Sequence, residues 1–290
     1  MTTTPNPQYL YRPADRVSFE EGCDALRRQG RQVIPFPVDI TRPATIDGIK
    51  HLGRKAGLTF NDFTIDLEAF AAYVEAAGYT REYAGYYVGN QKEKSLEHFI
   101  ALTLLQPKPG EVFVDLASEH SPVAEIYGRL TGVASYSQDI MYEAGIHDGR
   151  IGGDACAMPV PDGFISSAAL TCSLEHFEQD GDRRLFSELA RALRPGGAVC
   201  VVPFYLNVAH VVQTDPSVSV PANVPFDPDA VVYCTKGWEN RHARFYSPQT
   251  FVDRIIEPAR DHFAFDLYYL TNAAAIDTIY ARFAFVATRR

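Results

Sequence analysis

From about residue 91 onward, short apolar runs alternate with segments that repeat hydrophobic residues at helical spacing. The apolar runs predict strands at 112–117, 133–139, 164–173 and 198–206, and the periodic segments predict helices at 92–106, 121–132, 180–197 and 247–259. Two further apolar runs, 262–270 and 278–288, lie close enough to pair as a terminal hairpin. Strands that alternate with helices are typical of an open α/β sheet.

The first 90 residues have a different pattern, with helical segments at 18–30, 45–57 and 66–79 around a short apolar stretch, 32–38. We expect residues 1–90 to form an N-terminal extension, or lid, packed on the sheet domain of residues 91–290. A long insert, 206–246, separates the fifth strand from the next helix. Loops of this length in compact domains usually cover or bind something.

Charge and composition exclude several classes of partner. The formal net charge of -9 argues against DNA or RNA, whose phosphates are held by Lys and Arg. The N-terminus has no basic segment followed by an apolar one, and no apolar run reaches the ~20 residues that span a bilayer, so we expect a soluble, cytoplasmic protein. The five cysteines are scattered without zinc spacing, and we expect no metal.

The segment 153–206 carries a distinctive series of motifs: "GDA", then "PVPDGF", which is close to the pattern P-x-x-D-x-x-F, an acidic and His-bearing loop "SLEHFEQD", and "LRPGG" before a strand. In this order the motifs resemble the second half of class I S-adenosylmethionine-dependent methyltransferases, and the resemblance spans about residues 91–290. It implies a doubly wound, seven-stranded, mostly parallel sheet with one antiparallel strand, and S-adenosyl-L-methionine as the cofactor.

The loop after the first strand departs from that family. Where such enzymes show D-x-G-x-G-x-G, this chain has "DLASEHS", with Ala117, Glu119 and Ser121 in place of glycines. A carboxylate in this loop would repel the phosphates of a dinucleotide, but it can accept a hydrogen bond from the ammonium group of S-adenosylmethionine. The loop therefore disfavours a nicotinamide cofactor and tolerates S-adenosylmethionine.

The resemblance implies a set of cofactor contacts. Asp139 follows the second strand, which suits a carboxylate that binds ribose hydroxyls, and Asp154 with Ala155 matches the position that recognises adenine. Asp115 would orient the loop or contact the methionine amine, while Tyr86 and Lys92 would cover the methionine end or only dock the extension. Further expected contacts are Ala117, Ser118, Glu119, Ile140 and Ser173.

Glu175 and His176 follow the fourth strand, at the sheet edge where open α/β folds bind ligands. His176 is a candidate general base, because histidine titrates near neutral pH, or else a packing residue. The insert ends in "CTKGWENRHARFYS", which supplies candidate substrate contacts or ties the insert to the sheet: Trp238, Arg241, His242 and Tyr246.

The sequence thus predicts a methyltransferase acting on a hydroxyl of a small molecule or sugar. The alternative from another class is a catalytically silent protein that binds S-adenosylmethionine or serves as a scaffold, suggested by the missing glycines. The oligomeric state is not predicted.

Overall fold

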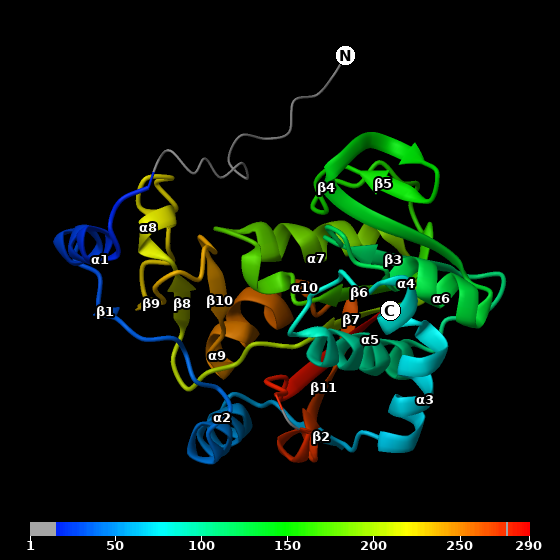
Figure 1. The fold of residues 1–290 in the computed structure, drawn as a ribbon, viewed down its shortest axis with the longest axis horizontal. Helices are drawn as coiled ribbons and strands as arrows, with labels where there is room; N and C mark the ends of the chain where they lie inside the picture. Colours follow the sequence, from blue (N-terminus) through cyan, green and yellow to red (C-terminus); the bar gives the residue numbers. More distant parts are fainter. Residues whose placement is uncertain (1–15, 277) are drawn as a thin grey trace. The chain divides into compact units, whose positions relative to one another are not determined.

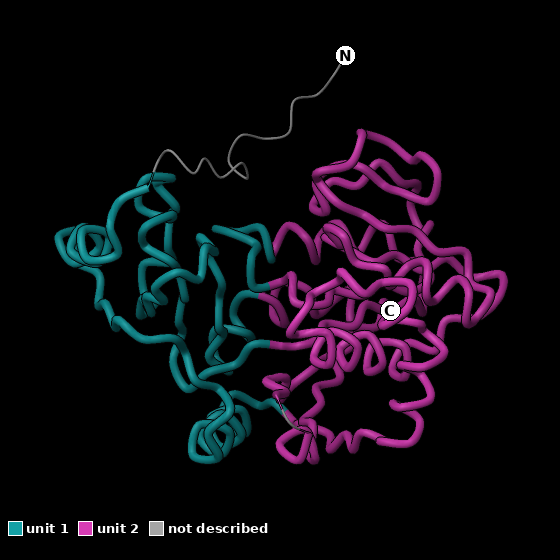
Figure 2. Tube along the Cα trace, in the orientation of Figure 1, with its two compact units in different colours: residues 1–58, 175–182, 205–254 teal, residues 59–174, 183–204, 255–290 magenta. Residues whose placement is uncertain are grey.

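A computed structural model describes residues 16–276 and 278–290. The chain divides into two compact units (Figure 2), unit 1 with residues 1–58, 175–182 and 205–254, and unit 2 with residues 59–174, 183–204 and 255–290. Residues 59–90 therefore lie within unit 2, and the insert 206–246 shares unit 1 with the first part of the chain. The roles of lid and substrate-side insert stay predictions.

Unit 2 contains an eight-stranded sheet in the order β2-β11-β12-β7-β6-β3-β4-β5 (Figure 1). Its strands are β2 (Phe60–Phe63), β3 (Val112–Leu116), β4 (Ala134–His147), β5 (Arg150–Gly152), β6 (Ile165–Thr171), β7 (Leu193–Val202), β11 (Phe263–Leu270) and β12 (Phe283–Arg289). Neighbours pair in parallel except on both sides of β12, which is antiparallel to β7 and to β11. The mostly parallel sheet with one antiparallel strand and the β11–β12 hairpin confirm the predicted fold class.

Helices cover both faces of this sheet, because alternate residues of its strands are apolar on each face. Cys200 of β7 and Ala284 of β12 pack in a cluster with α5, while Phe285, between the β12 residues of that cluster, stacks near Phe186 of α7. The helices of unit 2 are α3 (Leu67–Ala77), α4 (Tyr79–Glu82), α5 (Gln91–Leu105), α6 (Val123–Thr131), α7 (Gly181–Ala192, whose first two residues belong to unit 1) and α10 (Glu257–Ala259). The sheet is doubly wound, as predicted.

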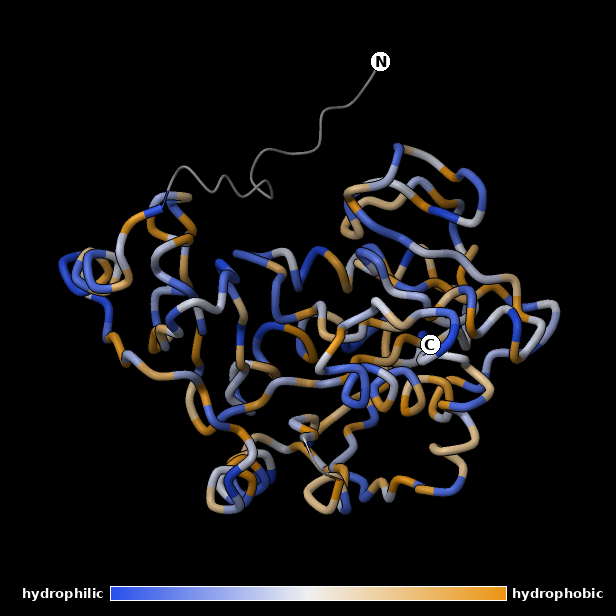
Figure 3. Tube along the Cα trace, viewed as in Figure 1, coloured by the Kyte–Doolittle hydropathy of each residue, from blue (hydrophilic) through white to orange (hydrophobic). Residues whose placement is uncertain are grey.

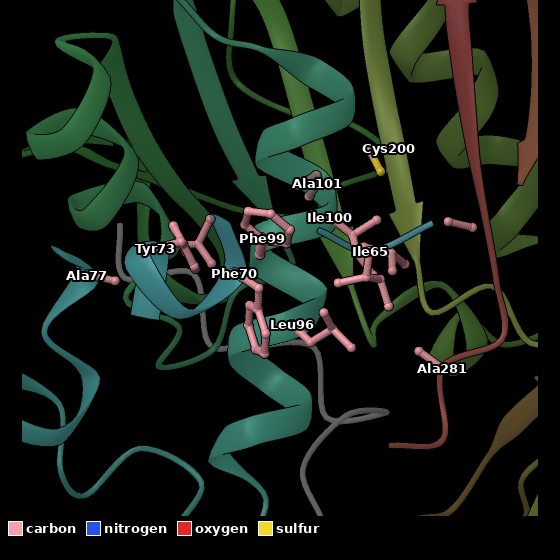
Figure 4. Close-up of a cluster of buried hydrophobic side chains, with 14 of the residues drawn as sticks. Ile65, Phe70, Tyr73, Ala77, Leu96, Phe99, Ile100, Ala101, Cys200 and Ala281 are labelled. Atoms are coloured by element: carbon pink, nitrogen blue, oxygen red, sulfur yellow. The ribbon is translucent and has the colours of Figure 1, made fainter. Parts of the chain in front are cut away.

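The close-up in Figure 4 shows how α3 is attached to the sheet through α5. Phe70 and Tyr73 of α3 lie against Phe99 of α5, with ring centroids 5.5 and 5.6 Å away, and Leu96 and Ile100 belong to the same buried cluster. Aromatic pairs at such distances add to the hydrophobic stabilisation. Part of the predicted N-terminal extension is thus core packing of unit 2.

The main departures from the predicted elements concern their ends. β2 is an eighth strand that the sequence did not predict, because its residues show no alternation of buried and exposed positions. The predicted helix 180–197 ends at Ala192, and the "LRPGG" motif opens β7. We call the loop 117–121, between β3 and α6, the cofactor loop. The helix after it has Pro122 as N-cap, one residue later than the Ser121 that capping preference suggests, and ends at a left-handed Gly132.

Beyond Asp139, the second strand does not give way to a crossover helix. β4 runs on to His147, and its segments 137–139 and 144–147 both pair with β5, so the chain crosses the end of β5 at Glu143. A Cβ at Gly152 would lie 1.8 Å from the Glu143 carbonyl oxygen, and only glycine fits at this crossing. The arm 140–150 begins directly after Asp139, whose side chain accepts a hydrogen bond from the Glu119 amide.

Unit 1 is built on a four-stranded sheet in the order β1-β9-β8-β10. Its elements are α1 (Phe19–Arg28), β1 (Val33–Ile34), α2 (Pro43–Lys55), β8 (Val211–Thr214), α8 (Pro216–Ser219), β9 (Val231–Cys234), β10 (Ala243–Phe245) and α9 (Pro248–Phe251), which continues as a π-helical turn, Val252–Ile256, into unit 2. Figure 3 shows hydrophobic stretches that stay short along the chain. None of the helices among the described residues combines the length and the apolar character needed to cross a membrane.

Candidate cofactor and acceptor site

The loop after β3 adopts the backbone of a glycine-rich loop without its glycines. Ala117 and Glu119 have φ values of 50° and 49°, in the left-handed region that favours glycine. The end of β4 holds both residues in place: the Ala117 amide donates to Gln138 Oε1 (3.1 Å) and the Glu119 amide to Asp139 Oδ2 (2.8 Å). These hydrogen bonds offset the backbone strain that the substitutions introduce.

Asp139 organises the loop from the middle of β4, just after the pairing with β3 ends. Its second oxygen accepts from the Met141 amide (2.9 Å), so the carboxylate links the loop to the first residues of the arm. Tyr142 adds a second link, because its hydroxyl donates to the Glu119 carbonyl (2.6 Å) and lies 3.1 Å from the Ser118 hydroxyl.

Asp115, the last residue but one of β3, is a buried carboxylate whose two oxygens make no hydrogen bond to the described residues. Burial raises the pKa of this carboxyl to about 7, and nearby Asp139 acts in the same direction, while nearby Ser121 lowers the pKa without a well-formed hydrogen bond. Burial, reinforced by the Asp115 charge, also raises the pKa of the Tyr86 phenol. A buried carboxylate without partners is costly unless a cationic or donor group meets it.

The remaining expected cofactor residues lie around the same strand ends. Ser173, after β6, places its hydroxyl 3.4 Å from the Ala117 carbonyl, and Ala155 is buried. Asp154 closes a turn by accepting from the Cys156 amide (2.9 Å), and a half-exposed Arg184 lies 3.6 Å away. Ile140 is partly buried at the start of the arm.

The lysine of α5 that is buried in unit 2 is Lys94, whereas Lys92 is exposed. The Lys94 ammonium donates to both oxygens of Glu97, at 3.1 and 3.0 Å, and lies 5.1 Å from the centroid of the Tyr87 ring. Glu93 also faces inward, and burial raises the pKa of its carboxyl to about 7. Helical spacing places residues 93, 94 and 97 on one face, a signal in the sequence that distinguishes Lys94 from Lys92.

The candidate catalytic residues Glu175 and His176 belong to unit 1. His176 Nδ1 lies 2.6 Å from the His242 carbonyl oxygen, which fixes Nδ1 as the protonated nitrogen and leaves Nε2 basic; Nε2 is 3.7 Å from Glu175 Oε1. His242 Nδ1 in turn donates to the Glu175 carbonyl (3.0 Å). Burial, helped by the Arg244 charge, lowers the pKa of His242 to about 3, so this histidine is neutral.

The predicted substrate residues differ in accessibility. Trp238 is partly buried, with its ring 6.4 Å from that of His176, and Arg241 pairs with Glu178 at 2.6 and 3.0 Å. His242 and Tyr246 are buried, and the Tyr246 hydroxyl donates to Asp182 (2.9 Å).

Tyr246 is part of a buried charge cluster in unit 1, formed by Asp182, Asp227, Arg244 and Arg254. The fully buried Arg244 lies 3.3 Å from Asp182 and 2.7 Å from Asp227, and Arg254 lies 2.7 Å from Asp182. His210 joins them, 3.2 Å from Asp227.

No three His, Cys, Asp or Glu side chains gather in a metal-binding arrangement anywhere in residues 16–276 or 278–290.

Comparison with known proteins identifies the sheet domain. A family model described as a methyltransferase domain matches residues 117–201, from the cofactor loop to β7. The match supports the class I S-adenosylmethionine-dependent methyltransferase family that the motifs indicated. This methyltransferase is therefore an enzyme whose cofactor is S-adenosyl-L-methionine, as predicted.

Several solved structures are similar to the methyltransferase at low identity. A Burkholderia thailandensis 1,6-didemethyltoxoflavin-N1-methyltransferase is 12% identical, with 80% of this chain and 93% of that chain covered and a TM-score of 0.48. Haemonchus contortus phosphoethanolamine N-methyltransferase 2 is 13% identical, with 76% of this chain and 60% of that chain covered and a TM-score of 0.43. The PH0226 protein of Pyrococcus horikoshii is 16% identical, with 76% of this chain and 98% of that chain covered and a TM-score of 0.41. No curated protein matches the chain significantly.

Sequence reasoning missed four residues that shape the site: Lys94, Gln138, Tyr142 and Tyr280. Gln138 precedes Asp139 and was open to detection, because a polar residue inside an apolar strand needs a partner. Tyr280 precedes the last strand and carries no local signal.

Proposed function

We propose that the methyltransferase transfers a methyl group to a hydroxyl of a small polar molecule, with sugars as the favoured class. One observation supports the placement of the cofactor: the buried Asp115 carboxylate without a partner, behind a loop that carries Glu119. An ammonium group would satisfy this carboxylate, whereas the pyrophosphate of a dinucleotide would be repelled. The residues present thus fit S-adenosylmethionine.

The cofactor supplies a methyl group activated by its positively charged sulfur. Asp115 would hold the ammonium group, and Asp139, whose oxygens each accept one backbone hydrogen bond, has lone pairs left for ribose hydroxyls. Asp154 and Ala155 would contact the adenine. Lys94, in place of Lys92, is the buried cation of this region.

The proposal that the acceptor group is a hydroxyl is based on residues of unit 1. His176 would take the proton of the acceptor on Nε2, since its Nδ1 is committed to the His242 carbonyl, and Glu175 would stabilise the resulting imidazolium. Trp238 and Arg241 would contact the acceptor. We assign His242 and Tyr246 to supporting roles, because their side chains are buried.

Calorimetry with S-adenosylhomocysteine and with NAD tests the cofactor site. We expect binding of S-adenosylhomocysteine and none of NAD; binding of NAD alone would refute the proposal. Turnover with an accepted sugar separates the enzyme from a silent binding protein. His176→Ala should lower kcat by about 10²- to 10⁴-fold, with partial recovery at high pH if it removes a general base.

A further inference from the structure

Tyr280 lies where α5 meets the carboxyl end of β6 in unit 2. Its hydroxyl is 3.3 Å from Glu97 Oε1, 3.5 Å from Asn90 Nδ2 and 3.8 Å from the Cys172 sulfur. The next residue after Cys172 is Ser173, which reaches the Ala117 carbonyl of the cofactor loop. The phenol of Tyr280 is thus close to the loop that would hold the methyl donor.

The backbone and the hydroxyl of Tyr280 are both fixed by buried carboxylates of α5. Glu93 accepts from the amides of Tyr280 (2.9 Å) and Ala281 (3.0 Å). Glu97, which is fully buried and anchored by Lys94, can only accept a hydrogen bond, so the phenol directs its hydrogen to Glu97. Any other hydrogen bond at the phenol oxygen is therefore one that this oxygen accepts.

Tyr280 lies near buried charged groups and a half-exposed aromatic ring. Lys94 and Glu97 are buried, Tyr280 and Cys172 are partly exposed, and the Tyr87 ring above Lys94 is 46% exposed. Tyr87 also packs edge-on against Tyr86, at 4.8 Å, and the Asp115 charge helps to raise the pKa of the Tyr86 phenol. These side chains thus link the surroundings of Tyr280 to the carboxylate expected to hold the cofactor amine.

We infer that Tyr280, held by Glu97, positions the methyl acceptor by accepting a hydrogen bond from a second hydroxyl beside the reacting one. The acceptor is then a vicinal diol on a ring that can lie against Tyr87, as in a sugar or a dihydroxybenzene. Burial and the Glu97 charge raise the pKa of the Tyr280 phenol, which therefore stays neutral and does not act as a base. This inference rests on the proposed function and names its substrate class.

Two probes differ only at the second hydroxyl: 1,2-dihydroxybenzene, and 2-methoxyphenol, in which that donor is methylated. Binding of each is measured by calorimetry on the full chain saturated with S-adenosylhomocysteine. We expect 1,2-dihydroxybenzene to bind at least about 5-fold more tightly, because only it can donate to Tyr280. Equal binding of the two compounds, or binding of neither, would overturn the inference.

Three variants separate this role from a structural one. Tyr280→Phe should bring the two affinities within about 2-fold and leave S-adenosylhomocysteine affinity unchanged, while Tyr136→Phe, a partly buried tyrosine of β4, should preserve the preference. In Glu97→Gln, the amide oxygen turns to Lys94 and its NH₂ group to Tyr280, so the phenol hydrogen turns away from residue 97 and can donate to the ligand. The preference should then shift toward 2-methoxyphenol.

A preference unchanged in Tyr280→Phe and Glu97→Gln, with both proteins folded by circular dichroism, would also overturn the inference. If S-adenosylhomocysteine itself does not bind the wild-type protein, the proposed function fails instead. The two failures are therefore distinguishable.

Discussion

Buried charges occur in both units of the methyltransferase, but they are treated in opposite ways. In unit 1, Asp227 is surrounded by Arg244, Arg254 and His210, which hold the pKa of its carboxyl well below its usual range despite burial. In unit 2, Asp115 has no comparable partner, and burial raises its pKa to about 7. The same residue type is neutralised by neighbouring charges in one unit and has no hydrogen-bond partner among the described residues in the other.

This difference separates structure from function. A closed set of two arginines and two aspartates satisfies itself and fixes the packing of β10 and the 175–182 segment, whereas an unpartnered carboxylate lowers stability until something binds. The direction of the pKa shift and the number of hydrogen-bond partners both distinguish the two sites.

The largest effect is expected from breaking the closed cluster. Asp182→Ala leaves Arg244 and Arg254 with fewer counter-charges and removes the acceptor of the Tyr246 hydroxyl, which should lower the free energy of unfolding by about 3–5 kcal/mol in urea titrations. Asp47→Ala, at an exposed position of α2 in the same unit, is the control. A loss below about 1 kcal/mol would show that the cluster is not a closed structural unit.

Asp115→Asn should have a smaller effect, and its sign should depend on pH. The folded protein holds a proton on Asp115 more tightly than the unfolded chain, whose Asp has a pKa near 4, so this residue costs stability progressively as pH rises from 4 to 7. Asparagine should therefore be stabilising at pH 8, by on the order of 2–4 kcal/mol, and nearly neutral at pH 4.

Urea unfolding at the two pH values checks this prediction. The same variant should bind S-adenosylhomocysteine more weakly, because its amide cannot attract the ammonium group. An identical pH profile for the wild type and Asp115→Asn would remove the basis for the contrast between the units.

A smaller change in free energy is expected for two carboxylates that already have hydrogen-bond partners. Asp139→Ala should weaken S-adenosylhomocysteine binding by about 1–3 kcal/mol, through lost ligand contacts and through release of the Glu119 amide. Asp154→Ala should fall at the lower end of that range, since its side chain is 41% exposed. Calorimetry ranks the two, and the reverse order would place the adenosine elsewhere.

The sequence was informative where structure is local and periodic. Strands β3, β6 and β7 and helix α5 follow from apolar runs and helical spacing, and the "LRPGG" segment was one of several motifs that carried the family resemblance, although its place in β7 was not expected. The strands of unit 1 were missed, because β8 and β9 lie inside what reads as one long insert and β1 has only two residues. The pairing of β1 with β9 joins segments about 200 residues apart, which no local pattern reveals.

The candidate site followed the same rule. Asp115, Glu119 and Asp139 occupy positions at strand ends, and the structure gathers them around one loop. Lys94, Glu97 and Tyr280 meet only because α5 packs beside the start of β12, a contact over more than 180 residues. Arg244 and Asp182 were equally invisible as a pair, since their separation of 62 positions gives no periodic signal.

The smallest change in stability and cofactor affinity is expected for a substitution of Lys92. This substitution tests whether burial distinguishes a lysine of the cofactor site from an exposed lysine on the same helix. Lys92 and Lys94 are two positions apart on α5, yet only Lys94 is buried and paired. Lys92→Met should change the free energy of unfolding by less than about 0.5 kcal/mol, because exposed substitutions away from special features rarely do more. The affinity for S-adenosylhomocysteine should stay within about 2-fold, whereas a drop of 10-fold or more would show that Lys92 reaches the methionine carboxylate and that burial misidentifies the cation of this site.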